Sequence, residues 1–233
     1  MAIFAISDLH LSTADETNKS MEVFGRRWAD YTERLRRAWT AVVSDSDTVV
    51  IPGDVSWATS LGEALSDLRF LEALPGKKIL GKGNHDFWWA TASKLSAFTE
   101  ANHLSTISFL HNNAILVGDC AIAGTRGWFS EDDTVHGDAE KLIRREAMRL
   151  QLSLQSAKAL SPARTLAFLH FPPIWNGQIC RPILDVLHAH GITECFYGHI
   201  HGVYSIPASF DYEGIRMTII AADYLEFLPK RIV

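Results

Sequence analysis

Residues 78–86 read KILGKGNHD, a short apolar run that leads through glycines into amide, imidazole and carboxylate side chains. Four other strand-like runs along the chain also end in polar residues. The five runs cover residues 2–6, 48–51, 78–80, 165–169 and 194–197. The first run leads to Asp8 and His10, the second to Asp54, and the third to Asn84, His85 and Asp86. The fourth leads to His170, and the fifth to His199 and His201. Because open α/β sheets bind ligands beyond the carboxyl ends of their strands, these endings predict one site along one edge of a buried sheet.

The length and composition of the chain predict one globular domain. Of its 233 residues 47% are hydrophobic, which is enough apolar material for a sizeable core. No Pro/Gly/Ser-rich linker divides the chain, so we expect a single domain over residues 1–233. The longest apolar runs are far shorter than the roughly 20 residues of a membrane span. Met1 leads into the first run without the basic start of a secretory signal, and we therefore expect a cytoplasmic protein without a membrane partner.

Charge and cysteine usage exclude further classes of protein. A net charge of −5 argues against a dedicated nucleic-acid-binding protein, which would usually carry a basic face. Cys120, Cys180 and Cys195 are widely spaced and form no CxxC pair, so we interpret them as reduced thiols. Nothing in the sequence specifies an oligomeric state.

The spacing of apolar residues predicts helices on the outside of two packed, mixed sheets. Helical periodicity covers about residues 27–44, 61–74, 88–99, 139–160 and 182–190. Through the first ~100 residues these helices alternate with strands, which favours parallel pairing. The chain therefore has the pattern of an α/β protein.

The middle of the chain departs from this alternation. Residues 106–111, 114–117 and 120–124 predict a meander at or beyond the edge of a sheet, with turns at Asn112-Asn113 and Gly118-Asp119. A last strand is expected within residues 215–221. Residues 11–24 and 125–138 read as long loops, and because such loops are usually functional we expect both at the rim of the site.

The polar residues at the strand ends have the chemistry of a site for two metal ions. Two ions about 3.5–4 Å apart need a bridging group, and a carboxylate with two oxygens can supply it. Asp8 and His10 lie two residues apart, so on an extended strand end both side chains face the same side. His199 and His201 repeat this spacing, and Asp54 follows Gly53, where the backbone can turn sharply.

In their order, D-x-H, GD, GNHD, a lone His and GHxH, these motifs resemble the calcineurin-like metallophosphoesterase superfamily over residues 8–201. The resemblance implies an αββα sandwich, in which two mixed β-sheets are flanked by helices. It also implies two divalent cations, for which we expect Mn²⁺ first and Fe, Zn, Co or Ni as alternatives. By resemblance, Asp8, His10, Asp54 and His201 would hold one ion, and Asp54, Asn84, His170 and His199 would hold the other.

The same resemblance gives His85 a role apart from the metals. It would lie beside the leaving oxygen as a general acid or a charge-stabilising donor, while a water or hydroxide between the ions attacks phosphorus. The two ligand carboxylates and two divalent ions sum to −2 + 4 = +2, so an acidic chain would carry a pocket that attracts phosphate. Arg126 is a further candidate for contact with the substrate.

Departures from the superfamily narrow the predicted function. The GDxxDRG motif of protein phosphatases is absent, because Val55-Ser56-Trp57 follows Asp54. The motifs resemble more closely a small bacterial group of predicted phosphohydrolases. We expect a phosphomonoesterase or phosphodiesterase that acts on a small phosphate ester or nucleotide-type substrate. A nuclease of the same superfamily and a non-catalytic scaffold are the alternatives, and Asp86 is a candidate for orienting His85.

Overall fold

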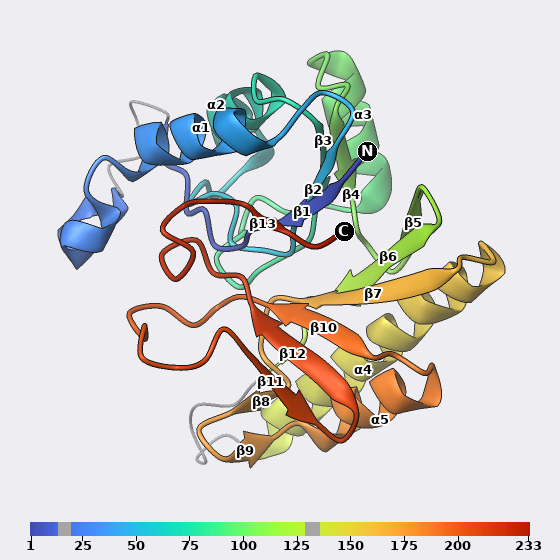
Figure 1. Ribbon diagram of the computed structural model, residues 1–233. Helices are drawn as coiled ribbons and strands as arrows, with labels where there is room; N and C mark the ends of the chain where they lie inside the picture. Colours follow the sequence, from blue (N-terminus) through green and yellow to red (C-terminus); the bar gives the residue numbers. More distant parts are fainter. Residues whose placement is uncertain (14–19, 129–135) are drawn as a thin grey trace.

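Two β-sheets pack face to face, and helices cover the outer side of each (Figure 1). This computed structural model describes residues 1–13, 20–128 and 136–233. Within these residues the first sheet has the strand order β13-β1-β2-β3-β4 and the second has the order β11-β12-β10-β7-β6-β5. The arrangement confirms the predicted αββα sandwich.

The strands of the first sheet are β1 (Ile3–Ala5), β2 (Thr48–Ile51), β3 (Lys77–Leu80), β4 (Ile107–Phe109) and β13 (Lys230–Arg231). The second sheet contains β5 (Ala114–Val117), β6 (Cys120–Thr125), β7 (Arg164–Leu169), β10 (Glu194–Tyr197), β11 (Ser209–Tyr212) and β12 (Ile215–Ile219). Strands β1 to β4 are mutually parallel, as are β6, β7, β10 and β12, whereas β13, β5 and β11 run antiparallel at the edges. A short ribbon pairs β8 (Ile174–Trp175) with β9 (Gln178–Ile179).

The helices divide between the two sheets. The first half carries α1 (Tyr31–Val42), α2 (Leu61–Glu72) and α3 (Ala92–Ala101), and the second half carries α4 (His136–Ala159) and α5 (Arg181–Ala189). Two 3₁₀ turns, Met21–Phe24 and Arg26–Trp28, precede α1. The predicted helix over residues 88–99 starts later than expected, because the side chain of Thr91 accepts a hydrogen bond from the Lys94 amide and so caps α3.

Alternation along each strand creates three layers of core. Phe4 packs under the helices of the first half, whereas its neighbours Ile3 and Ala5 face the second sheet. Leu166 and Phe168 meet them from β7, and Ala167 turns outward to the helices of the second half. Because successive side chains of a strand point to opposite faces, apolar residues at every position are what a sheet covered on both sides requires.

The predicted meander is wrong in its pairing. Strand β4 pairs in parallel with β3 in the first sheet, whereas β5 and β6 form a hairpin at the edge of the second. Between them the chain crosses from sheet to sheet through Leu110, which is buried in the layer that the sheets share. Asn112 takes a left-handed conformation (φ 61°) at this crossing, so it turns the chain between sheets and not within a hairpin. Gly118-Asp119 does form the predicted hairpin turn.

Other sequence expectations have simpler outcomes. Residues 14–19 and 129–135 of the two predicted loops lie outside the described residues. The three cysteines are free thiols and all are buried. Among the described helices, none combines the length and the apolar character that crossing a bilayer would need.

Candidate metal centre

Backbone hydrogen bonds tie the strand ends of both sheets together at one edge of the sandwich. The Asp8 amide donates to the carbonyl of Gly53 at 3.0 Å, and the Gly198 amide donates to that of His170 at 3.1 Å. The two sheets are joined directly, since the His199 amide donates to both carboxylate oxygens of Asp8 at 3.0 and 2.9 Å. The loops that carry the predicted site residues are therefore one structural unit.

The side chains at this edge form two neighbouring groups. Asp8, His10 and His201 make up the first group, and Asp54, His170 and His199 make up the second. In each group one possible ligand atom per residue lies within 4.8 Å of the others.

Asp54 joins the two groups. Its Oδ2 lies 3.5 Å from Nε2 of His10 and 3.5 Å from Nε2 of His170. Asn84 belongs to the same cluster, because its Oδ1 is 2.6 Å from Nε2 of His170. The structure thus brings together all seven residues that the sequence proposes as ligands.

The atoms of the cluster fit bound cations. Nε2 of His10 lies 3.1 Å from Nε2 of His201, and two imidazole nitrogens at this distance need a proton or a cation between them. Among the described residues, the buried Nδ1 atoms of His10 and His170 have no hydrogen-bond partner. Mixed imidazole and carboxylate donors are the ligands that divalent transition metals prefer. The residues present therefore fit a pair of such ions.

Electrostatics also favour positive charge here. Burial raises the pKa of Asp54 well above its usual value, and the nearby carboxylates of Asp86 and Asp8 raise it further. Burial also opposes ionisation of Asp8, but its hydrogen bond to His201 and the charge of His170 hold its pKa well below the usual range. Two buried carboxylates this close together repel each other unless cations lie between them.

The histidines divide into neutral and charged rings. Burial lowers the pKa of His170 to about 3. Burial also lowers the pKa of His10, and the charge of His201 lowers it further. Burial also opposes the charge on His201, but hydrogen bonds to Asp223 and Asp8 outweigh it and raise its pKa to about 10. Without metal, His201 is therefore the cation of the first group.

Backbone strain is concentrated at the same residues. Asp8, His10, Asp54 and His199 all have a left-handed backbone, with φ of 61°, 45°, 50° and 68°. For residues with a Cβ atom this conformation costs roughly 1–2 kcal/mol each. Such strain persists where the surrounding structure holds a functional geometry in place.

Two glycines allow the loops to approach the carboxylates. A Cβ atom on Gly83 would collide with Oδ1 and the backbone nitrogen of Asp54. A Cβ atom on Gly198 would collide with Oδ2 of Asp8 and with Ser7. The glycines of the GNHD and GHxH motifs are thus required by close packing against the two carboxylates.

Asp86 holds the loops of the site together. Its fully buried carboxylate accepts from the backbone amides of Asp54, Val55, Ser56 and Gly83 at 2.7–3.2 Å and from Nε1 of Trp88 at 3.0 Å. The imidazole of His85 is not among these five donors. Asp86 thus acts as the clamp between the GD and GNHD loops, and a role in orienting His85 stays a prediction.

His85 lies beside the first group. Its amide donates to Oδ1 of Asp54 at 2.8 Å, and its ring centroid is 5.5 Å from that of His10. Trp57 packs against both rings, with centroids 4.4 Å from His85 and 4.8 Å from His10. Trp57 therefore helps to hold two rings of the site.

Sequence reasoning missed Asp223, which supports His201 from behind. Its buried Oδ1 is 3.0 Å from Nδ1 of His201, and its Oδ2 accepts from the Gly202 amide at 2.9 Å and from the Tyr204 hydroxyl at 3.0 Å. A carboxylate on Nδ1 fixes the ring so that Nε2 faces the first group. The signal was present, because Asp223 follows the predicted strand over residues 215–221 and is a sixth polar strand ending.

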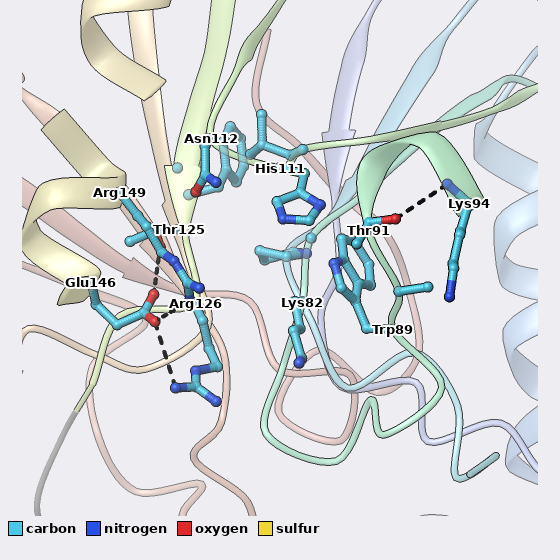
Figure 2. A pocket seen from close by; sticks show the side chains of 16 residues that line it. Lys82, Trp89, Thr91, Lys94, His111, Asn112, Thr125, Arg126, Glu146 and Arg149 are labelled. Carbon is cyan, nitrogen blue, oxygen red and sulfur yellow. Dashed lines mark hydrogen bonds and ion pairs between the residues drawn. The ribbon is translucent and has the colours of Figure 1, made fainter. Parts of the chain in front are cut away.

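Arg126 lies outside the two groups. Its carbonyl accepts from the amides of His170 and Phe171 at 3.1 and 2.8 Å, while its side chain lines a neighbouring cavity (Figure 2). There its Nη2 is 3.6 Å from Oε1 of Glu146. Its contact with substrate stays a prediction.

Known proteins resemble this chain in sequence or in fold. The family model for calcineurin-like phosphoesterases matches residues 1–203. The Gene 66 protein of Mycobacterium phage L5 is 38% identical over 84 residues. These residues make up 34% of this chain and 37% of that protein, so the alignment covers little more than a third of the relative's length. Phosphopantetheinyl hydrolase (PptH) from Mycobacterium tuberculosis has a similar fold, with a TM-score of 0.57 at 12% identity over 100% of this chain and 95% of that one. A protein of unknown function from Aquifex aeolicus gives a TM-score of 0.51 at 16% identity, with 99% and 95% of the two chains covered.

Proposed function

The chain belongs to the calcineurin-like phosphoesterase family, and from this premise we propose that it hydrolyses small phosphate esters with the help of two divalent cations. One observation carries the proposal: the Asp54 carboxylate lies 3.5 Å from a histidine of each group, where a bridging ligand would be. Asp8, His10 and His201 would hold the first ion with Asp54. Asn84, His170 and His199 would hold the second with the same carboxylate.

Divalent cations held there would polarise the phosphate and lower the pKa of a water molecule to about 7. The other tasks fall to the protein. Asp223 keeps the His201 ring turned toward the first group, and Asp86 fixes the loops that carry Asp54 and His85. His85, packed against Trp57, would give a proton to the leaving oxygen. We propose Mn²⁺ as the first metal to test.

The experiment is hydrolysis of bis(p-nitrophenyl) phosphate and p-nitrophenyl phosphate by chelator-treated protein to which Mn²⁺ is added back. We expect turnover that depends on Mn²⁺ in the wild type and is lost in Asp54→Asn. Asp211→Asn is the matched control, because Asp211 is an exposed carboxylate paired with Arg216 on β11 and β12. Absence of metal-dependent turnover of both esters by the wild type would contradict the proposal.

A further inference from the structure

A cavity of about 530 Å³ opens between the two halves of the sandwich beside the metal centre. Figure 2 shows Lys82, Trp89 and Lys94 on one side and Arg126, Glu146 and Arg149 on the other. Pro52 and Lys82, which also line it, are each two residues before a proposed ligand, Asp54 and Asn84. The cavity thus adjoins the loops of the centre.

The walls of this cavity are strongly basic in an acidic protein. The cavity is lined by four cationic side chains, Lys82, Lys94, Arg126 and Arg149, and by one carboxylate, Glu146, which gives 4 − 1 = +3 within a chain of net charge −5. Glu146 is already engaged, because its Oε1 lies 2.7 Å from Nη1 of Arg149 and its Oε2 accepts from Thr125 at 2.7 Å. Among the described lining residues, the remaining positive charge has no acidic counterpart.

Two buried nitrogens that line the cavity lack a hydrogen-bond partner among the described residues. Within the described part of the chain, the buried Nε of Arg126 and Nδ1 of His111 make no hydrogen bond. Neither Lys82 nor Lys94 forms an ion pair there.

We propose that this cavity is a subsite for a second phosphate group of the substrate, distinct from the phosphate that is cleaved at the metal centre. The inference rests on the proposed function, because it places the cleaved phosphate at the two metal groups. A phosphate group matches the lining well, since a guanidinium binds its oxygens in a fork and lysines add point charges around it. The subsite would favour small molecules with two phosphate groups over those with one.

Two variants test the subsite. Lys82→Gln removes a cation at the part of the cavity nearest the GNHD loop. Lys77→Gln is the matched control, because Lys77 is exposed at the opposite end of β3 and does not line the cavity. Binding of inorganic pyrophosphate is measured by calorimetry on the chelator-treated full chain, in which no metal can hold the anion. We expect saturable binding that is at least about tenfold weaker in Lys82→Gln and unchanged in Lys77→Gln.

Turnover with Mn²⁺ then tests whether the cavity binds a phosphate group of the substrate or free phosphate. The ratio of kcat/KM for adenosine 3′,5′-bisphosphate to that for adenosine 5′-monophosphate should fall at least about tenfold in Lys82→Gln. An unchanged ratio together with pyrophosphate binding would assign the cavity to free phosphate and overturn the substrate subsite. Lack of pyrophosphate binding would overturn the anion site itself. If pyrophosphate binds but no ester is hydrolysed, the proposed function fails and the anion site stands.

Discussion

Proton displacement from His201 should make metal binding strongly dependent on pH. Its Nδ1 faces the Asp223 carboxylate at 3.0 Å, and its Nε2 faces Nε2 of His10 at 3.1 Å, so both nitrogens carry protons in the metal-free protein. A pKa raised to about 10 agrees with this assignment. A cation in the first group would take the place of the proton on Nε2. Below pH ~10 the ion in the first group must therefore release at least about one proton when it binds, and its affinity should rise about tenfold per pH unit.

Between about pH 6 and pH 8 this amounts to roughly 100-fold in affinity, or about 2.7 kcal/mol. Calorimetric titration with Mn²⁺ over this range, in pairs of buffers with different ionisation enthalpies, measures affinity and proton release together. Asp223→Asn should flatten the dependence above about pH 7, because loss of the carboxylate lowers the pKa of His201. An affinity that changes less than about threefold between pH 6 and pH 8, or no proton release, would refute the assignment of the proton to Nε2.

Three further predictions concern the clamp, the proton donor and the stability of the metal-free protein. Asp86→Ala leaves five buried donors without their acceptor. Urea titration should therefore show a free energy of unfolding that is lower by at least about 3 kcal/mol. A loss under about 0.5 kcal/mol would contradict the role of Asp86 as a clamp. His85→Ala should lower kcat for an alkyl phosphate by about 10²–10⁴-fold while metal content is retained. The loss should be much smaller for a p-nitrophenyl ester, because its leaving group needs no proton. Equal losses for the two esters would argue against proton donation, and His190→Ala is the control. Because the folded-state pKa of His201 is raised, its contribution to the stability of chelator-treated protein is complete below about pH 6.5 and is lost as pH rises through about 10. Denaturation at several pH values should show a decline on the order of 5 kcal/mol, and a flat profile would contradict it.

Local patterns in the sequence determined much of the fold. The bounds of β2 and β10 match the predicted runs, because short apolar runs bounded by turn residues specify buried strands without reference to distant parts of the chain. The order of the strand endings indicated the family, which the family model confirms over residues 1–203. The sequence also identified the six side chains of the two groups and Asn84, which contacts His170 beside them. Their roles as metal ligands stay predictions.

Tertiary structure decided what depends on contacts between distant residues. Residues 107–109 and 114–117 are both strand-like, and only pairing with β3 or β6 assigns them to different sheets. The sequence position of Asp86 beside His85 does not reveal that its carboxylate accepts hydrogen bonds from the backbone amides of two separate loops. Strand alternation gives no information on which polar group a folded loop will bring to a buried carboxylate.

The sequence by itself determined the list of seven proposed ligands, because they follow five strands and strand endings are local signals. Only the fold set Asp223 behind His201, 22 residues away, and His10 against His201, 191 residues away. Only the fold, too, brought Lys82 and Arg126 from different sheets to one basic cavity. The physical reason is that hydrogen bonds and charge interactions act over a few ångströms in space, whereas the sequence records separation along the chain.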